Sequence, residues 1–306
     1  MNYIGSGPYC YANSLAMSID GAFDPRLLEV ATGSPFGAQL LGGRMPMFDP
    51  YGWDPDLGLA QAIDAIGWAC DVTTGGTAET AEARLRAASP RDPILVGPVD
   101  MGLLRYQPGM SGPIGADHFV VVLGVDADRV VSHDPHGHPY ATLPIHDFLA
   151  AWSSGTVGYG EPFTGRTAFR RVRDVSPDQA LRTLLPAFTE WSAGRTDLPV
   201  PPGTLGNRDA VLALADAADD GLDPEVKGTL TYFSARVGAR RAADGAWALR
   251  ELGLPEAADV LTQRARLLGG LQYDLVHDIP ISPALRRLAE TYPPLTELLR
   301  AAPVGR

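Results

Sequence analysis

The feature that most constrains the fold is a change in hydrophobic pattern near residue 174. Before it, short apolar runs typical of β-strands alternate with Gly- and Pro-rich turns; after it, only helical periodicity is found. The chain has 306 residues, which is long enough for two hydrophobic cores. The sequence therefore predicts the α+β class, with an antiparallel-sheet domain over residues 1–174 and an all-α domain over residues 175–306.

The strongest strand signals form a predicted hairpin. The run 118–124 (HFVVVLG) is followed by a short Asp-containing turn and by the β-rich run 129–135. His118 and Asp134 are equally far from Asp126 in the sequence. With Asp126 at the centre of the hairpin, the two side chains would lie directly opposite each other, with Cβ atoms ~5 Å apart. A slip of one residue would put them on opposite faces of the sheet.

Periodicity also predicts the other elements of both domains. Two further strands are expected over residues 93–99 and 167–172. Helices are expected in the first domain over residues 57–67, 78–88 and 145–152, and in the second over residues 177–193, 209–218, 225–252, 255–277 and 282–301.

Cys10 is a candidate nucleophile. It follows a Gly- and Pro-rich turn at residues 5–8 and begins a segment with helical apolar spacing. The unpaired N–H groups and the dipole at a helix N-terminus stabilise a thiolate, so we expect a lowered Cys10 pKa and faster alkylation than at Cys70. The alternative is that Cys10 is a small buried hydrophobic residue, as most free cysteines are.

Cys10, His118 and Asp134 together resemble the catalytic residues of papain-like cysteine enzymes. The cysteine begins a helix, the histidine opens a strand, and the acid lies on the next strand. In such enzymes the imidazole takes the thiol proton and later protonates the leaving group, while the acid fixes the imidazole tautomer. The order and context of these residues therefore predict a papain-like site.

Two segments carry a closer resemblance. Residues 116–126 and 130–135 resemble bacterial peptidases that remove double-glycine leader peptides, and resemble the butirosin-biosynthesis protein H family more closely. Residues 93–101 (PILVGPVDM) and the Arg-containing helical domain are also similar to that family.

The resemblance to the butirosin family implies a papain-like fold and an acyltransferase of antibiotic biosynthesis. An acyl group would move from an acyl carrier protein thioester to a small amine acceptor, without a cofactor. Cys10 would form the acyl-enzyme, His118 would be general base and acid, and Asp134 would orient the imidazole. A cysteine peptidase or thioesterase, or a non-catalytic papain-like binding module, is the alternative.

The oxyanion site departs from the papain-like pattern. Such proteases and the leader peptidases place a Gln about six residues before the cysteine, where this chain has Ile4. The Cys10 backbone N–H then needs another donor, for which Asn13 and Asn2 are the candidates. This departure disfavours an efficient peptidase.

Two further groups are candidates for binding. Phe48, Tyr51 and Trp53 lie on an irregular segment, residues 32–56, and could line a substrate pocket or pin that segment to the core. Arg236 and Arg240 share a helical face and could dock the carrier protein. The alternative for this pair is a solvated stripe.

Composition excludes several classes of function. The formal net charge of −11 argues against a nucleic-acid partner and is compatible with cationic small molecules. No apolar run approaches the ~20 residues that span a membrane, and no signal segment is recognised, so a cytoplasmic protein is expected. Two cysteines are too few for a Cys-rich zinc site, and the cluster His133, His136 and His138 lacks a fourth ligand, so no metal is expected.

Overall fold

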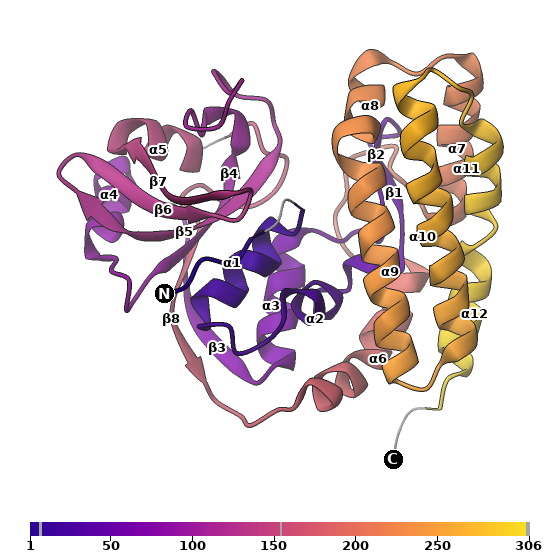
Figure 1. Ribbon diagram of the computed structural model, residues 1–306, viewed down its shortest axis with the longest axis horizontal. Helices are drawn as coiled ribbons and strands as arrows, with labels where there is room; N and C mark the ends of the chain where they lie inside the picture. Colours follow the sequence, from indigo (N-terminus) through magenta and orange to yellow (C-terminus); the bar gives the residue numbers. More distant parts are fainter. Residues whose placement is uncertain (6–7, 154, 304–306) are drawn as a thin grey trace. The chain divides into compact units, whose positions relative to one another are not determined.

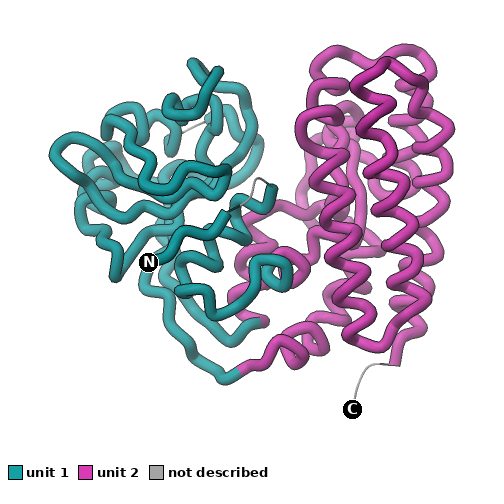
Figure 2. The backbone as a smooth tube through the Cα atoms, viewed as in Figure 1, with its two compact units in different colours: residues 1–28, 66–174 teal, residues 29–65, 175–306 magenta. Residues whose placement is uncertain are grey.

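The computed structural model describes residues 1–5, 8–153 and 155–303 (Figure 1). They form two compact units: unit 1 contains residues 1–28 and 66–174, and unit 2 contains residues 29–65 and 175–306 (Figure 2). The chain is of mixed α and β structure, with antiparallel sheets and a helical C-terminal region. One boundary between the units falls after Asp174, where the sequence predicts a domain boundary. Residues 29–65, however, belong to unit 2, whereas the sequence predicts them in the first domain.

The described part of unit 1 contains a six-stranded antiparallel sheet with the order β3-β8-β4-β5-β6-β7. Its strands are β3 (Trp68–Thr73), β4 (Ile94–Asp100), β5 (Asp117–Asp126), β6 (Arg129–Asp134), β7 (His138–Pro144) and β8 (Gly165–Arg171). The helices are α1 (Cys10–Ser18), α4 (Ala78–Ala87) and α5 (Ile145–Trp152), with the short 3₁₀ turn η2 (Met101–Leu103) and with α2 (Pro25–Ala31) at the junction of the units. The strands predicted over residues 93–99, 118–124 and 129–135 correspond to β4, β5 and β6.

The two faces of β5 are covered by different helices. Val120 and Val122 pack in a core with residues of α4 and α5, whereas Val121 and Leu123 pack against Met17 of α1. Strand side chains alternate between faces, so this division explains the continuous apolar run of the strand. The central position of β5 brings the helix that begins with Cys10 against the strand that carries His118.

The register of the β5–β6 hairpin differs from the predicted one. The pairing begins with Asp126 opposite Arg129, and a bulge follows between Val122 and Gly124. Beyond the bulge Val121 pairs with His133, so continuing the register places Asp134 beside Val120. Because Val120 and His118 share a face, His118 and Asp134 meet diagonally and are not directly opposed.

Gly124 has the backbone conformation that this bulge requires. Its φ of 142° lies in the range that favours glycine, and an added Cβ would lie 3.1 Å from the carbonyl oxygen of Ala88. Without the extra residue, Asp134 would align with Val121 and point to the opposite face from His118. The bulge therefore determines whether the two side chains can meet.

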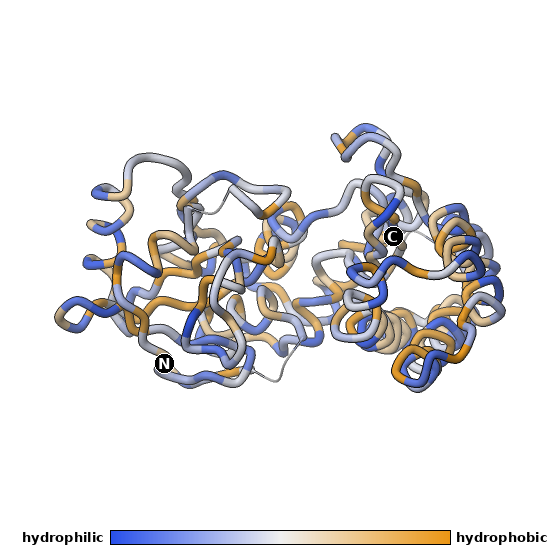
Figure 3. Tube along the Cα trace, turned by 90° about the horizontal axis from the view of Figure 1, so that it is seen from above, coloured by the Kyte–Doolittle hydropathy of each residue, from blue (hydrophilic) through white to orange (hydrophobic). Residues whose placement is uncertain are grey.

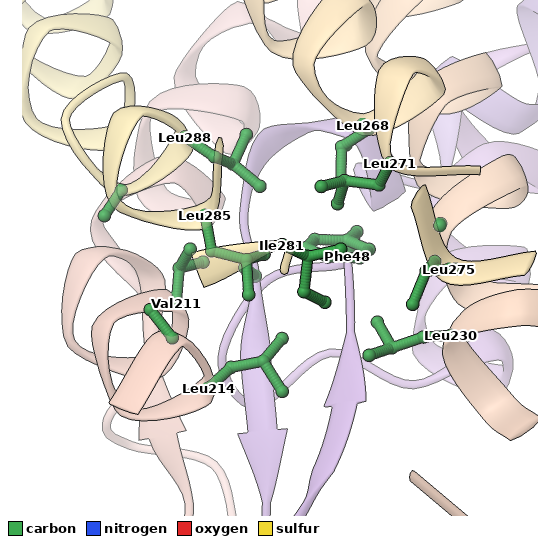
Figure 4. Packing of buried hydrophobic residues seen from close by; sticks show 14 of the residues in the cluster. Phe48, Val211, Leu214, Leu230, Leu268, Leu271, Leu275, Ile281, Leu285 and Leu288 are labelled. Atoms are coloured by element: carbon green, nitrogen blue, oxygen red, sulfur yellow. The ribbon is translucent and has the colours of Figure 1, made fainter. Parts of the chain in front are cut away.

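Unit 2 is built from helices around one leucine-rich core. The helices are η1 (Ser34–Phe36), α3 (Pro55–Ala65), α6 (Pro177–Ala193), α7 (Asn207–Asp220), α8 (Pro224–Thr229), the π-helical turn η3 (Leu230–Ser234), α9 (Ala235–Glu251), α10 (Pro255–Val276), α11 (Ser282–Ala289) and α12 (Tyr292–Ala301). Phe48 from the segment 29–65 lies among Leu268, Leu271 and Leu288 in this core (Figure 4). This packing explains why the segment belongs to unit 2.

The C-terminal region is not entirely helical. A two-residue strand, β9 (Leu205–Gly206), pairs with β1 (Gln39–Leu41), which also pairs with β2 (Met45–Met47). A strand of two residues has no periodicity to detect, so the predicted all-α domain omitted it. The helix predicted over residues 282–301 is two helices, because Pro293 and Pro294 occupy the first turn of α12.

Hydrophobic and hydrophilic residues alternate in short stretches along the helices of unit 2 (Figure 3). This is the pattern of helices with one face packed against a core. In the described part of the chain, no helix has the length and apolar character needed to cross a bilayer.

Candidate active site

Cys10 is the first residue of α1, as the Gly- and Pro-rich turn predicts. Tyr9 precedes it in the left-handed conformation, with φ of 77°, and so turns the chain into the helix. Ser14 donates a hydrogen bond of 3.1 Å from Oγ to the Phe119 carbonyl oxygen, which ties α1 to β5. Ser6 and Gly7 of the predicted turn lie outside the described residues.

The amide of Asn13, one of the two oxyanion candidates, is bonded to the backbone that precedes Cys10. Its Nδ2 donates to the carbonyl oxygens of Pro8 at 3.3 Å and Tyr9 at 2.9 Å, and its side chain is buried. An amide nitrogen has two protons, so both are used in holding the turn before Cys10. The other candidate, Asn2, is exposed, and Ile4 packs in the cluster around Met17.

His118 links Cys10 and Asp134. Its Nε2 lies 2.7 Å from Oδ1 of Asp134, and the ring is also hydrogen-bonded to the Cys10 thiol. Because Nε2 faces the carboxylate, Nδ1 is the ring atom available to sulfur. His118 is 4% exposed and Asp134 is fully buried, whereas Cys10 is partly exposed. The structure therefore brings the three predicted residues together in one relay.

The Asp134 carboxylate accepts four hydrogen bonds from the described residues. His118 Nε2 and the His136 backbone N–H contact Oδ1, each at 2.7 Å. Tyr106 Oη and Gln107 Nε2 donate to Oδ2 at 2.9 Å and 2.7 Å. Sequence reasoning missed Tyr106 and Gln107, because they lie in an irregular segment without a motif.

The segment that carries Tyr106 and Gln107 connects β4 to β5 and is held at its ends by Asp100. The buried Asp100 carboxylate accepts hydrogen bonds from the backbone N–H groups of Gly102, Ile114 and Gly115. These contacts close the segment beside the end of β6, where Asp134 lies.

Burial and the three side chains set the pKa values of the site. Burial alone lowers the pKa of His118, but the Asp134 carboxylate and the Cys10 contact outweigh it and raise this pKa to about 10. Burial likewise opposes ionisation of Asp134, but His118 and the other donors hold the pKa of its carboxyl well below the ordinary value.

The expected lowering of the Cys10 pKa is wrong. Burial raises the pKa of the thiol, and the hydrogen bond from His118, which lowers it, does not compensate. The nearby Asp117 carboxylate raises this pKa further. Asp117 itself accepts a hydrogen bond of 2.6 Å from Tyr159 Oη. Loss of water around the sulfur is thus the largest influence on the Cys10 pKa.

The three aromatic candidates belong to unit 2, where each has packing partners. Phe48 lies in the leucine core, and Trp53 is buried with Nε1 donating to the Thr32 carbonyl oxygen at 2.8 Å. Tyr51 is half-buried against Gly194 and Gly206. These contacts agree with the alternative that the aromatic residues pin their segment to a core.

Arg236 and Arg240, which the sequence predicts on one helical face, differ in their exposure. Arg236 is exposed, whereas Arg240 is half-buried with Nε 3.7 Å from Oδ2 of Asp244. The adjacent Arg241 is buried, and its guanidinium contacts Glu29 and Asp49, each at 2.8 Å. Sequence spacing did not distinguish this buried arginine from its exposed neighbours.

The histidine cluster provides no described metal site. His133 is buried, and its Nδ1 accepts a hydrogen bond of 3.1 Å from the Tyr140 backbone N–H. Among the described residues, no group of three or more His, Cys, Asp or Glu side chains is arranged to hold a metal ion.

Comparisons with known proteins found a matching family and a curated relative. A family described as the YobF C-terminal domain matches residues 201–300, which lie within unit 2. The chain is also 32% identical over 161 residues to the uncharacterized protein YobF of Bacillus subtilis (strain 168). That alignment covers 51% of this chain and 52% of YobF, so the chain spans about half the length of the curated relative it matches. It is therefore similar to a protein whose description names no activity.

Proposed function

We propose that this chain is a cysteine-dependent acyltransferase of natural-product biosynthesis, related to the butirosin-biosynthesis protein H family. The observation that carries the proposal is the relay in which His118 contacts the Cys10 thiol and the Asp134 carboxylate. Unit 1 is then a papain-like domain, because a helix that begins with cysteine packs on an antiparallel strand that carries histidine. The substrates are a carrier-bound thioester and a small amine.

Acyl loading follows from the positions of the three groups. The Cys10 thiolate attacks the thioester carbonyl carbon, and a new C–S bond forms as the bond to the carrier sulfur breaks. The His118 imidazolium gives its proton to the departing carrier thiolate. Asp134 remains ionised and keeps the imidazole oriented through Nε2. The products are the Cys10 acyl-enzyme and the free carrier thiol.

Transfer to the amine reverses these roles. The amine nitrogen attacks the acyl carbon, His118 accepts a proton from the nitrogen, and the bond to Cys10 sulfur breaks. The result is an amide, a Cys10 thiolate and an imidazolium. Asp117 lies next to His118 and acts electrostatically on Cys10, so its carboxylate favours a cationic acceptor over a neutral one.

A specific observation favours a second candidate function, a non-catalytic binding module. The pKa of Cys10 is raised by burial, and Asn13 is already bonded to backbone carbonyl oxygens. Both features reduce the reactivity that a nucleophile with an oxyanion donor would have.

Intact-protein mass spectrometry tests the proposal. The protein is incubated with acyl-carrier thioesters and with acyl N-acetylcysteamine thioesters of several chain types. We expect a mass increase of one acyl group in the unchanged protein and in Cys70→Ala, and none in Cys10→Ala. Adding an aminoglycoside or a polyamine should then discharge the adduct and produce the amide.

The outcomes separate the candidate functions. An adduct that is lost equally fast in buffer and with every amine identifies a thioesterase or peptidase, and overturns the transferase. If no thioester of either type loads Cys10 at alkaline pH, where the thiolate is formed, the binding module replaces the enzyme.

A further inference from the structure

We infer that Tyr106 and Gln107 are positioning residues, which hold Asp134 as a carboxylate in one orientation against His118. The inference rests on the proposed role of the Cys10, His118 and Asp134 relay. It concerns the state of Asp134 itself, however, so it can be tested whether or not acyl transfer is observed.

The hydrogen bonds of Asp134 divide evenly between its two oxygens. Oδ1 accepts from His118 Nε2 and the His136 N–H, and Oδ2 accepts from Tyr106 Oη and Gln107 Nε2. An ionised carboxylate has about four acceptor positions, and the described donors match that number. A carboxylate bonded on both oxygens cannot rotate about its terminal torsion without breaking all four bonds.

An ionised Asp134 accepts from all four donors at once. Gln107 Nε2 and the His136 N–H can only donate, and an anion accepts their protons more strongly than a neutral carboxyl does. Burial of Tyr106 and the nearby Asp134 charge raise the pKa of the phenol well above its ordinary value, so Tyr106 stays protonated and can donate. Gln107 is 4% exposed, which makes loss of its hydrogen bond costly.

The surroundings of Asp134 contain few other groups that titrate. The titratable side chains around Asp134 include His118, Tyr106, Tyr3 and His136. His138 is a further one, because it pairs with Asp134 between β6 and β7 and its ring packs against Tyr106. The Tyr3 hydroxyl donates to the Asp134 backbone carbonyl oxygen at 3.0 Å, so it bonds the main chain and not the carboxylate. His136 contacts the carboxylate through its backbone N–H. Tyr106 and Gln107 are therefore the described side chains that bond the carboxylate on the side away from His118.

The variants for the test are Tyr106→Phe, Gln107→Leu and their combination. Tyr106→Phe removes one hydroxyl and keeps the ring, so it preserves the packing of the segment. Tyr159→Phe is the matched control, because it removes a hydroxyl that donates to Asp117 and not to Asp134. The full chain is labelled with ¹³C at aspartate, and the Asp134 Cγ signal is followed during acid titration.

We expect the Asp134 signal of the unchanged protein and of Tyr159→Phe to remain that of a carboxylate below the ordinary pKa of 3.8. Each single variant should raise the Asp134 pKa by about one unit, and the double variant by more, because each lost donor destabilises the anion. Alkylation of Cys10 at pH 8 should also slow by about tenfold, as a less well oriented His118 lowers the thiol pKa less.

An unchanged Asp134 pKa in Tyr106→Phe would overturn the inference and leave the two residues as anchors of their segment. If Gln107→Leu does not fold, Tyr106→Phe decides alone. A raised Asp134 pKa in a protein that never loads an acyl group would support the positioning role while rejecting the acyltransferase.

Discussion

Cys10 and His118 are hydrogen-bonded to each other, and both hold their protons at neutral pH. Burial raises the pKa of the Cys10 thiol above its ordinary value of 9.0, and Asp134 helps to hold the pKa of His118 at about 10. The thiolate beside an imidazolium forms when Cys10 loses its proton while His118 keeps its own. The reactive state is therefore reached in alkaline solution and is rare at pH 7.

The rate of Cys10 alkylation should rise continuously with pH. In a Cys70→Ala background, iodoacetamide labelling should increase about tenfold per unit from pH 6 to pH 8, with a midpoint above pH 9. His118→Ala should move the midpoint further up, because the hydrogen bond from His118 lowers the thiol pKa. Peptide mass spectrometry measures the rate, and a plateau below pH 8 would contradict the raised pKa.

At the scale of elements, the β5 bulge sets the register of one hairpin, and the buried Arg241 cluster joins segments that are distant in sequence. The bulge at Gly124 places Asp134 on the face of His118. Arg241 of α9 contacts Glu29 and Asp49 in unit 2 and lies over the Trp53 ring at 5.3 Å. The bulge depends on Gly124 and the ion cluster depends on Arg241. We expect replacement of either residue to destabilise the protein.

Gly124→Val should destabilise the protein by about 1–3 kcal/mol, because valine is strained at a φ of 142°. Gly228→Ala is the matched control, since Gly228 lies in α8 with open space around its Cβ position and is not among the positive-φ glycines. This control should stabilise by about 0.4–1 kcal/mol. Chemical denaturation measures both changes, and equal values for the two variants would exclude the strain at Gly124.

Arg241→Met should lower the free energy of unfolding by about 3–5 kcal/mol, because it leaves the Glu29 and Asp49 carboxylates buried without their guanidinium. Arg236→Met, on an exposed position of the same helix, should change it by less than about 0.5 kcal/mol. Denaturation followed by tryptophan fluorescence compares them. Similar losses in the two variants would show that the buried ion cluster does not stabilise unit 2.

At the scale of the whole molecule, negative charge dominates. The formal net charge is −11, and Asp117 adds a carboxylate beside the Cys10 and His118 pair. Such a field attracts cations and repels anions over a distance that salt shortens to about 10 Å at 0.1 M. A cationic reagent should therefore reach Cys10 faster than an anionic one.

Two methanethiosulfonate reagents test this, one with a trimethylammonium group and one with a sulfonate. The cationic reagent should modify Cys10 several-fold faster at low salt after correction for intrinsic reactivity, and the ratio should fall at 0.5 M salt. Asp117→Asn should reduce the ratio. A ratio that does not respond to salt or to Asp117→Asn would reject an electrostatic preference for cationic acceptors.

Local signals were sufficient for several predictions. Apolar runs predicted β4, β5 and β6, and helical periodicity over residues 177–193 predicted α6. Local signals did not predict the edge strand β7 or the short strand β9, because neither contains an apolar run. They also did not predict the contacts of Tyr106 and Gln107, because these residues belong to no motif.

The sequence by itself determined the longer helices and the strands β4, β5 and β6, and that Cys10 begins a helix while His118 and Asp134 lie on neighbouring strands, because periodicity and capping are local properties. Only the tertiary structure decided the rest. The hairpin register depends on a bulge, the Asp134 donors come from a distant segment, and residues 29–65 join the helices through Phe48. The raised pKa of Cys10 was also decided by the tertiary structure, because desolvation depends on what packs around the sulfur and not on its neighbours in sequence.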